Sequence, residues 1–303
     1  FKSVIRLRSK KSVYNTMMQV DFQNDPKLFL SRFGLALAQN EVEHNLILSL
    51  CTRAQKSKGE GKPFDIRFST LSNDNEFVLT AVQTPPRNLV LSRARQPGNE
   101  EKLAEILAQH QAQFPGVIGP SDVSASFVNA WTVITGQKPT ECLDQIIYSL
   151  TKVLFPPQVE GTFRFATAKE TDIVAQWMQA FSKEALPKGE HSSDDSALTQ
   201  AKERIADQAV AVWDVGGRPV AQALLAGTDA VARIGGVYTP AEQRGKGYAS
   251  ALVAHLSQYA LDNGKRMCCL LADARNPVSN SIYRKIGYEF IGRSSHYIFG
   301  RGD

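Results

Sequence analysis

Two glycines one residue apart, Gly245 and Gly247, stand between a run of strand-forming residues and an amphipathic, helix-forming run. The surrounding segment 239–249 reads TPAEQRGKGYA. Closely spaced glycines let the backbone curl, so that several N–H groups and the helix N-terminus point at one spot and bind an anion. Arg244 and Lys246 add positive charge there. We therefore expect a turn that binds phosphate groups, within an α/β fold.

Neither of the common nucleotide-binding loops fits this segment. A P-loop needs glycine at position 240 and serine or threonine at 247, where the chain has Pro240 and Gly247. A dinucleotide-binding fingerprint needs a third glycine where Ser250 stands. Both classes are therefore excluded.

A proline-rich break divides the chain. Residues 155–161 read FPPQVEG, and neither a helix nor a central strand passes through two adjacent prolines followed closely by glycine. The 303 residues are enough for two domains. We expect a basic tail over 1–19, disordered or vector-derived, a first domain over 20–155 and a second over 161–303.

The part after the break alternates between strand and helix patterns. Thr167 and Glu170 have the spacing of a capping box, so a helix should begin there. Gly287 is expected to cap the last helix in a left-handed conformation. Strands are expected over 162–166, 209–215, 220–226, 230–238 and 267–272, with a final strand pair over 288–299, and further helices over 196–208, 247–262 and 279–286. This order predicts a mixed α/β layered domain.

The first half repeats the later part of this order. Strands are expected over 77–83, 88–95 and 145–152, with helices over 99–113 and 121–135. An internal duplication explains both the order and the length of the chain. An unrelated α/β cap is the alternative.

The segment Arg244-Gly245-Lys246-Gly247-Tyr248-Ala249 matches the R/Q-x-x-G-x-G/A signature of the GCN5-related N-acetyltransferase (GNAT) superfamily. Downstream, residues 273–288 read DARNPVSNSIYRKIGY and resemble the family's ending N-x-x-x-Y-x-x-x-G-[FY]. The two motifs occur in the family's order and cover about residues 161–300. The resemblance implies GNAT-like domains, each a mixed, mostly antiparallel sheet flanked by helices.

In this family the turn amides hold the pyrophosphate of coenzyme A, so the resemblance implies acetyl-CoA as co-substrate and requires no metal. A backbone N–H near Val237 or Tyr238 would polarise the thioester carbonyl, and Tyr283 would protonate the departing thiolate. The acceptor would be the amine of a small molecule, which attacks the acetyl carbon directly. The residues implied in cofactor binding are Val237, Tyr238, Thr239, Arg244, Gly245, Lys246, Gly247, Tyr248, Ala249, Ser250, Asn276, Asn280 and Tyr283.

The first half has no such turn at the matching place. Residues 93–99 read RARQPGN, with one glycine and a proline. We expect a degenerate GNAT-like partner that does not bind coenzyme A, which is an arrangement known among tandem members of the superfamily.

The sequence shows no evident general base. The strand 230–237 contains no acid and has Arg233 at its middle. Asp229, His255, Asp273 and His296 are candidates by residue type only. The missing base leaves a second function class open, a non-catalytic acyl-CoA sensor or scaffold.

Composition argues against other partners. The formal net charge is +5, and the five cations of the terminal tail, Lys2, Arg6, Arg8, Lys10 and Lys11, account for it. A nucleic-acid partner is therefore not expected. No stretch approaches the roughly 20 apolar residues of a membrane span. The four cysteines follow neither a metal nor a disulfide pattern, so we expect reduced thiols and a cytoplasmic location.

Overall fold

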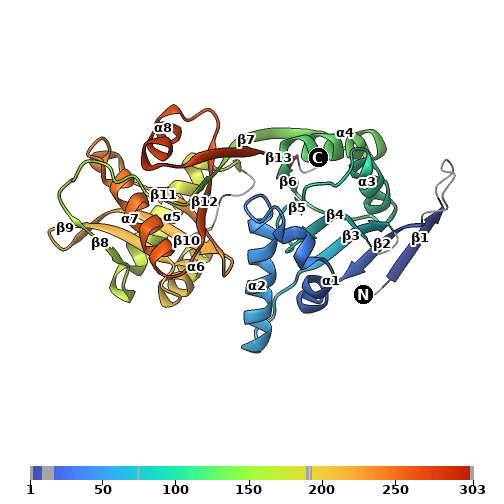
Figure 1. Cartoon of the computed structure of the whole chain (residues 1–303), viewed down its shortest axis with the longest axis horizontal. Coiled ribbons are helices and arrows are strands. Elements are labelled where there is room, and N and C mark those ends of the chain that lie inside the picture. The colour runs from blue at the N-terminus through green and yellow to red at the C-terminus, as the bar shows by residue number, and fades with distance from the viewer. Residues whose placement is uncertain (1–2, 9–16, 74–75, 189–190, 192, 301–303) are drawn as a thin grey trace. The chain divides into compact units, whose positions relative to one another are not determined.

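The computed structural model describes residues 3–8, 17–73, 76–188, 191 and 193–300 (Figure 1). Its contacts divide the chain into two compact units. Unit 1 comprises residues 1–144 and 292–303, and unit 2 comprises residues 145–291. Two strands, β7 (Pro139–Leu150) and β13 (Glu289–Phe299), pass from one unit to the other.

Unit 1 is a mixed sheet in the order β1-β2-β3-β4-β5-β6-β13, antiparallel except for the pair β5–β6. Its other strands are β1 (Ser3–Arg8), β2 (Met17–Gln23), β3 (Arg67–Asn73), β4 (Glu76–Gln83), β5 (Leu89–Leu91) and β6 (Gly116–Pro120). Its helices are α1 (Pro26–Ala38), α2 (Asn45–Gly59), α3 (Asn99–Gln109) and α4 (Ser121–Thr135).

Unit 2 has the order β8-β9-β10-β11-β12-β7, antiparallel except for the pair β11–β12. Its strands are β8 (Thr162–Phe165), β9 (Val210–Val215), β10 (Arg218–Gly227), β11 (Val231–Tyr238), β12 (Met267–Asp273) and the end of β7. Its helices are α5 (Thr171–Ala185), α6 (Asp194–Ala206), α7 (Tyr248–Asp262) and α8 (Pro277–Ile286), with short 3-10 turns η1 (Ala168–Glu170) and η3 (Ala241–Gln243).

The two units therefore share one topology, with the final strands exchanged. The strand that follows α4 in the chain pairs with β12 of unit 2, and the strand that follows α8 pairs with β6 of unit 1. Strand order and pairing sense thus repeat from β2 to β6 and from β8 to β12.

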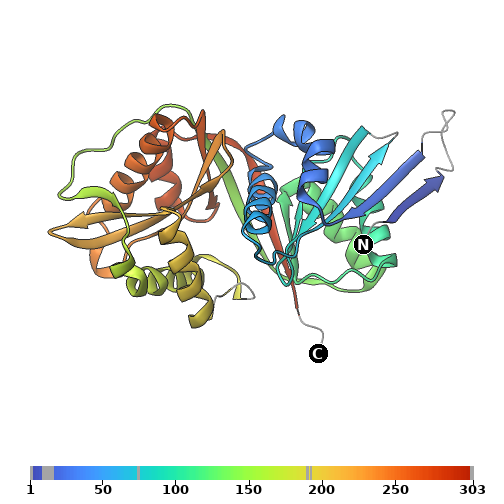
Figure 2. The same cartoon turned by 90° about the horizontal axis from the view of Figure 1, so that it is seen from below.

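Each sheet is covered by helices on both faces, as Figure 2 shows. In unit 1, α1 and α2 pack over one apolar cluster, which includes Phe29 and Phe68, and α3 and α4 pack over another, which includes Leu103 and Phe127. In unit 2, α5 and α6 cover a cluster around Val174 and Val212, whereas α7 and α8 cover the largest cluster. Burial on two faces explains why the strands read as near-continuous apolar runs.

Local signals set the ends of the helices in unit 2. The capping box of Thr167 and Glu170 is present, as expected. The Asn276 side chain accepts a hydrogen bond from the Ser279 amide at the start of α8, and Gly287 ends that helix at φ +103°. A left-handed backbone conformation costs glycine little free energy, so Gly287 can end the helix there.

The mixed, mostly antiparallel α/β organisation is confirmed, with several differences in detail. The strand pair expected over 288–299 is wrong: β13 is one continuous strand, because its second part pairs with β6 instead of folding back. The strand expected over 88–95 is reduced to three residues, and β1, β2, β3, β6, α1 and α2 were not predicted.

The domain limits expected from the sequence stay a prediction. Residues 151–161 contain no helix or strand, while β1 and the start of β2 fall within the expected tail 1–19. The rest of that tail before Met17 lies outside the described residues. Among the residues that are described, no helix combines the length and apolarity that a membrane span needs.

Candidate functional site

The turn between β11 and α7 presents its backbone amides to solvent. Gly245 lies at φ +79° and Gly247 at φ +84°, and Gly247 caps α7. Within the described part of the chain, the N–H groups of residues 245–250 donate to no acceptor. No acid lies in the first turn of α7. The turn therefore offers several unpartnered donors at the positive end of a helix, which suits a phosphate group.

The two basic side chains of the turn are engaged by neighbours. The Arg244 Nε donates to the Thr239 carbonyl oxygen at 2.8 Å, and its Nη2 lies 2.7 Å from a Glu184 carboxylate oxygen. The Lys246 ammonium donates to the Gln243 side-chain oxygen at 2.9 Å. Arg244 thus ties the turn to α5, while both cations remain exposed beside the free amides.

β11 and β12 part beside this turn. Their parallel register runs from Val231–Met267 to Arg233–Cys269 and then ends. β11 continues five residues further, to Tyr238, through a register shift against β10. The edge of β11 that would continue the ladder to β12 is thus left open over residues 234–238.

Tyr283 lies on α8 with its ring among other tyrosines. Its ring centroid is 6.3 Å from that of Tyr148 and 6.1 Å from that of Tyr288. Burial raises the pKa of Tyr283 to about 12, because the phenolate would lose its hydration. No described residue forms a hydrogen bond with its hydroxyl group. The hydroxyl is therefore protonated at neutral pH and free to donate.

The two asparagines of the second motif differ in their bonding. The Asn280 side chain is buried: it accepts from the Tyr148 hydroxyl and donates to the carbonyl oxygens of Asp273 and Asn276. This bonding holds the turn between β12 and α8. Asn276 uses only its side-chain oxygen, toward the Ser279 amide, so its NH₂ group remains available.

Sequence reasoning missed one polar side chain at the parted strands. Gln222 of β10 is fully buried, and neither its side-chain oxygen nor its nitrogen has a partner among the described residues. The hydroxyl of Thr239, one of the residues implied in cofactor binding, is buried and likewise has no partner in the described part of the chain. Such groups cost about 1–3 kcal/mol each when left unsatisfied. The only signal was a glutamine within the apolar strand 220–226, which belongs to no motif.

The base candidates lie in different surroundings. Asp229 precedes β11, at the end opposite the turn. His255 packs among aromatic rings, including those of Phe163 and Trp213, and partial burial lowers its pKa. His296 belongs to unit 1, where it bonds to Asn88. Asp273 stands at the end of β12 on the open side, paired with Arg275.

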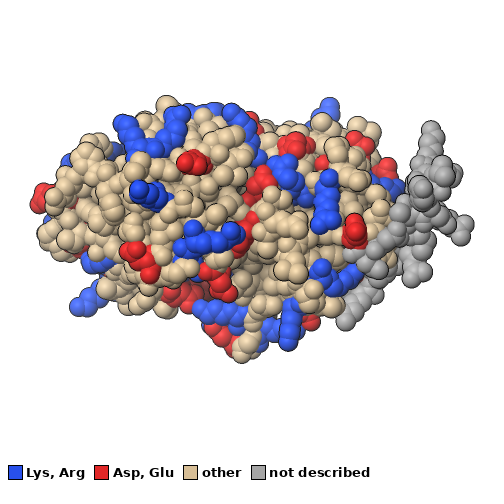
Figure 3. All heavy atoms as spheres, viewed as in Figure 1, with Lys and Arg blue, Asp and Glu red and all other residues tan. Residues whose placement is uncertain are grey.

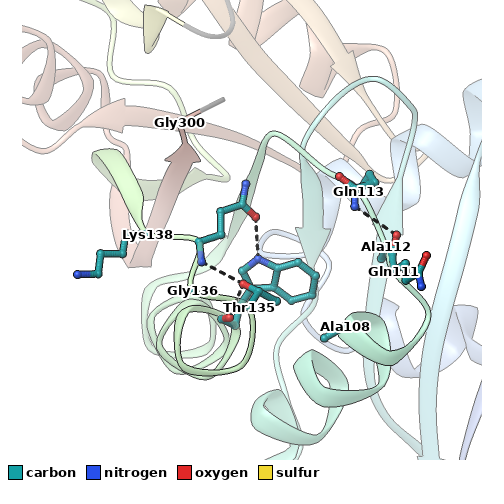
Figure 4. A pocket seen from close by; sticks show the side chains of 10 residues that line it. Ala108, Gln111, Ala112, Gln113, Thr135, Gly136, Lys138 and Gly300 are labelled. Carbon is teal, nitrogen blue, oxygen red and sulfur yellow. Dashed lines mark hydrogen bonds between the residues drawn. The ribbon is translucent and has the colours of Figure 1, made fainter. Parts of the chain in front are cut away.

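A cavity of about 620 Å³ lies elsewhere, in unit 1, at the ends of α3 and α4 (Figure 4). Polar groups of its lining are hydrogen-bonded to one another. The Trp131 indole N–H donates to the Gln137 side-chain oxygen, and the Gln137 backbone N–H donates to the Thr135 hydroxyl. It contains none of the residues that the two motifs single out. The cavity is therefore not the candidate site.

Comparison with known proteins agrees with this geometry. Residues 174–288 match the model of the acetyltransferase (GNAT) family. A search of curated proteins found no match. A Drosophila protein of solved structure is 15% identical with a TM-score of 0.70, covering 91% of this chain and 98% of that one.

Two further solved structures carry the family's name. A GNAT-family acetyltransferase from Colwellia psychrerythraea is 11% identical with a TM-score of 0.53, covering 98% of this chain and 100% of that one. A GCN5-related N-acetyltransferase from Sphaerobacter thermophilus is 20% identical with a TM-score of 0.55, covering 78% and 81%. At these identities the likeness shows the fold. Residues 174–288 form a GNAT-family acetyltransferase domain, and it lies in unit 2.

Proposed function

We propose that unit 2 is an acetyl-CoA-dependent N-acetyltransferase that acts on the amine of a small molecule. The observation that carries this proposal is the set of unpartnered amides at residues 245–250, beside the parted ends of β11 and β12. These amides would hold the pyrophosphate. Arg244, Lys246 and the exposed NH₂ group of Asn276 would surround the rest of the cofactor, and the open edge at Val237 to Thr239 would bind the pantetheine arm.

The open edge also supports the chemistry. A backbone N–H at Val237 or Tyr238 would polarise the thioester carbonyl, and loss of one such donor typically costs about 2.7–4 kcal/mol. The amine nitrogen attacks the carbonyl carbon and the carbon–sulfur bond breaks. Tyr283 would donate its proton to the leaving thiolate, the amine would release its proton to water, and Tyr283 would regain a proton from solvent. Positioning of the two substrates supplies the remaining acceleration.

We further propose that unit 1 is a degenerate copy of the same fold, with domains over 20–155 and 161–303, and that the protein is cytoplasmic. The repeated strand order supports the duplication. The four cysteines, all in the described part of the chain, form no disulfide bond there, which supports a reducing compartment. Figure 3 shows basic and acidic side chains interspersed on the face drawn, which favours a small-molecule substrate over nucleic acid.

The test is calorimetric titration of acetyl-CoA and CoA into the wild type, Gly247→Trp and Gly98→Trp. The last variant is the matched control, because Gly98 caps α3 at φ +89° as Gly247 caps α7. We expect binding lost in Gly247→Trp alone, and thiol release with members of an amine panel. Binding without thiol release for any amine would favour the sensor, and no binding by the wild type would end the proposal.

A further inference from the structure

One cation of unit 2 has no use in the site described so far. Arg233 is the last residue of β11 that pairs with β12, so it stands where the two strands begin to part. Within the described residues its guanidinium has neither a carboxylate partner nor a hydrogen-bond acceptor. The group is only partly exposed, and desolvation lowers its pKa from the ordinary value. A half-buried guanidinium without an anion is costly for the fold.

The side of the sheet that Arg233 faces follows from its neighbours. Ala232 and Ile234 belong to the apolar cluster under α7. Because alternate residues of a strand face opposite sides, Arg233 faces the side on which α5 packs. Tyr238, further along β11, is on that side too, since its ring contacts that of Trp177 on α5. The Arg233 guanidinium therefore lies on the α5 side of the sheet, opposite the side that α7 covers.

Unit 1 shows what the fold itself needs at this position. There the last parallel pair before the strands part is Val90–Ile118, and Val90 packs in the cluster under α1 and α2. A buried valine satisfies the packing, so the topology has no requirement for arginine. The difference points to a role of Arg233 in ligand binding.

A second unpartnered polar group belongs to the same region. Gln222 of β10 is in register with Tyr238 of β11, and its buried amide lacks partners. Ala221 and Ala223 on either side lie in the cluster under α7, which places Gln222 on the face of Arg233. Along β10 it is four residues from Ala226, the register partner of Arg233, and at about 3.3 Å per residue this spans roughly 13 Å.

We propose that Arg233 binds an anionic group, carboxylate or phosphate, on the acceptor, and that the acceptor is thus an amine that carries a negative charge. This inference rests on the proposed acetyltransferase function of unit 2. The guanidinium offers paired N–H donors that match either anion. Gln222 supplies an amide within reach of the acceptor's remaining polar atoms.

The test measures equilibrium binding of product-like probes to the CoA-saturated protein, so it does not depend on turnover. Each probe pair consists of an anionic compound and its neutral mate. The pairs are N-acetylglycine with N-acetylglycinamide, and N-acetylethanolamine phosphate with N-acetylethanolamine. Their binding is measured by NMR saturation transfer. We expect the wild type to bind at least one anionic probe about 10- to 100-fold more tightly than its neutral mate. The pair that shows the difference identifies the anion.

The variants separate charge recognition from folding. Arg233→Met should abolish the preference, Arg233→Lys should retain part of it, and Arg218→Met, which removes an exposed cation from β10, should leave it intact. Equal binding of both members of each pair, or binding of neither, would overturn the proposal, as would a preference that survives in Arg233→Met. The affinity for CoA, measured in the same samples, decides the proposed function separately.

Discussion

The turns before α3 in unit 1 and α7 in unit 2 have the same capping residue but differ in the two residues that precede it. Gly98 and Gly247 cap the two helices at φ +89° and +84°. Two residues before the cap, unit 1 has Gln96 where unit 2 has Gly245, and the residue between is Pro97 where unit 2 has Lys246. Proline has no N–H group and glutamine resists a positive φ. The same turn thus has fewer free donors in unit 1.

Unit 1 also has carboxylates at this position. Glu100 and Glu101 lie in the first turn of α3. The Glu100 side chain is buried, and its Oε2 has no hydrogen-bond partner among the described residues. The Asn99 side chain donates to the Gln96 carbonyl oxygen within the turn. The comparison teaches that the positive end of α7, unlike that of α3, carries no acid of the chain itself.

The largest effect is expected from removal of the strand that unit 1 receives from the end of the chain. Deletion of residues 292–303 removes Ile298 and Phe299 from the core of unit 1, together with the pairing of β13 with β6. Loss of two buried side chains should cost unit 1 about 3–6 kcal/mol. Urea unfolding should show unit 1 melting early while CoA titration shows binding retained. Loss of CoA binding with unit 1 still folded would contradict the assignment of the strand.

A carboxylate placed at the start of α7, as unit 1 has at the start of α3, should weaken binding of CoA at the proposed turn. Ala249 occupies the second position of α7, as Glu100 does in α3. Ala249→Glu should weaken CoA binding by roughly 10- to 100-fold, because its carboxylate competes with the phosphates for the same amides. Ala249→Gln, of equal size without charge, is the calorimetric control. Equal losses in both variants would point to steric exclusion instead.

Tyr283 and Thr132 stand four residues before the glycines that cap α8 and α4. Tyr283→Phe should lower the rate of thiol release about 100-fold, since the thiolate loses its proton donor, with the CoA dissociation constant unchanged. Thr132→Val should leave the rate unchanged, as its hydroxyl donates to the Gln137 carbonyl. A Tyr283→Phe enzyme of full activity would assign the tyrosine to packing.

Among the described residues, Gln222 in unit 2 and Gln23 in unit 1 are buried glutamines whose side-chain oxygen and nitrogen both lack partners. Replacement of either by leucine should raise the free energy of unfolding by about 1–3 kcal/mol, because an unsatisfied amide is removed. Only Gln222→Leu should lower turnover. Denaturant titration and the thiol-release assay measure the two effects. Equal activity in both variants would make Gln222 a structural residue.

The smallest expected effect is a difference in stability between the wild type and Tyr283→Phe at alkaline pH. Burial raises the pKa of Tyr283 to about 12, above the ordinary value of 10.0, so folding favours the protonated form. Its contribution to stability is complete below pH 10 and is lost as the pH rises toward 12. Between pH 10 and 11 the wild type should lose about 1 kcal/mol more than Tyr283→Phe in urea unfolding. Parallel losses would mean that the tyrosine is not desolvated.

Local patterns predicted the second half well. The capping box at Thr167, the left-handed Gly287 and the turn before α7 depend on residues close in sequence, and the structure contains all three. The elements before Phe77 were missed, although Asp25 and Pro26 mark the start of α1 as its N-cap and first residue. The candidate site rests on the two motifs and stays a prediction, and no motif singled out the buried Gln222 beside it.

By itself the sequence determined the glycine turn before α7, since glycine conformations and helix caps are decided within a few residues, and the match of residues 174–288 to the GNAT family. Tertiary structure decided which strands pair. The pairs β7–β12 and β13–β6 join residues far apart in the chain, so local patterns do not specify them. Long-range packing also decided that the Asn280 side chain is hydrogen-bonded. It likewise decided that, among the described residues, the Tyr283 hydroxyl and the Arg233 guanidinium have no hydrogen-bond partner.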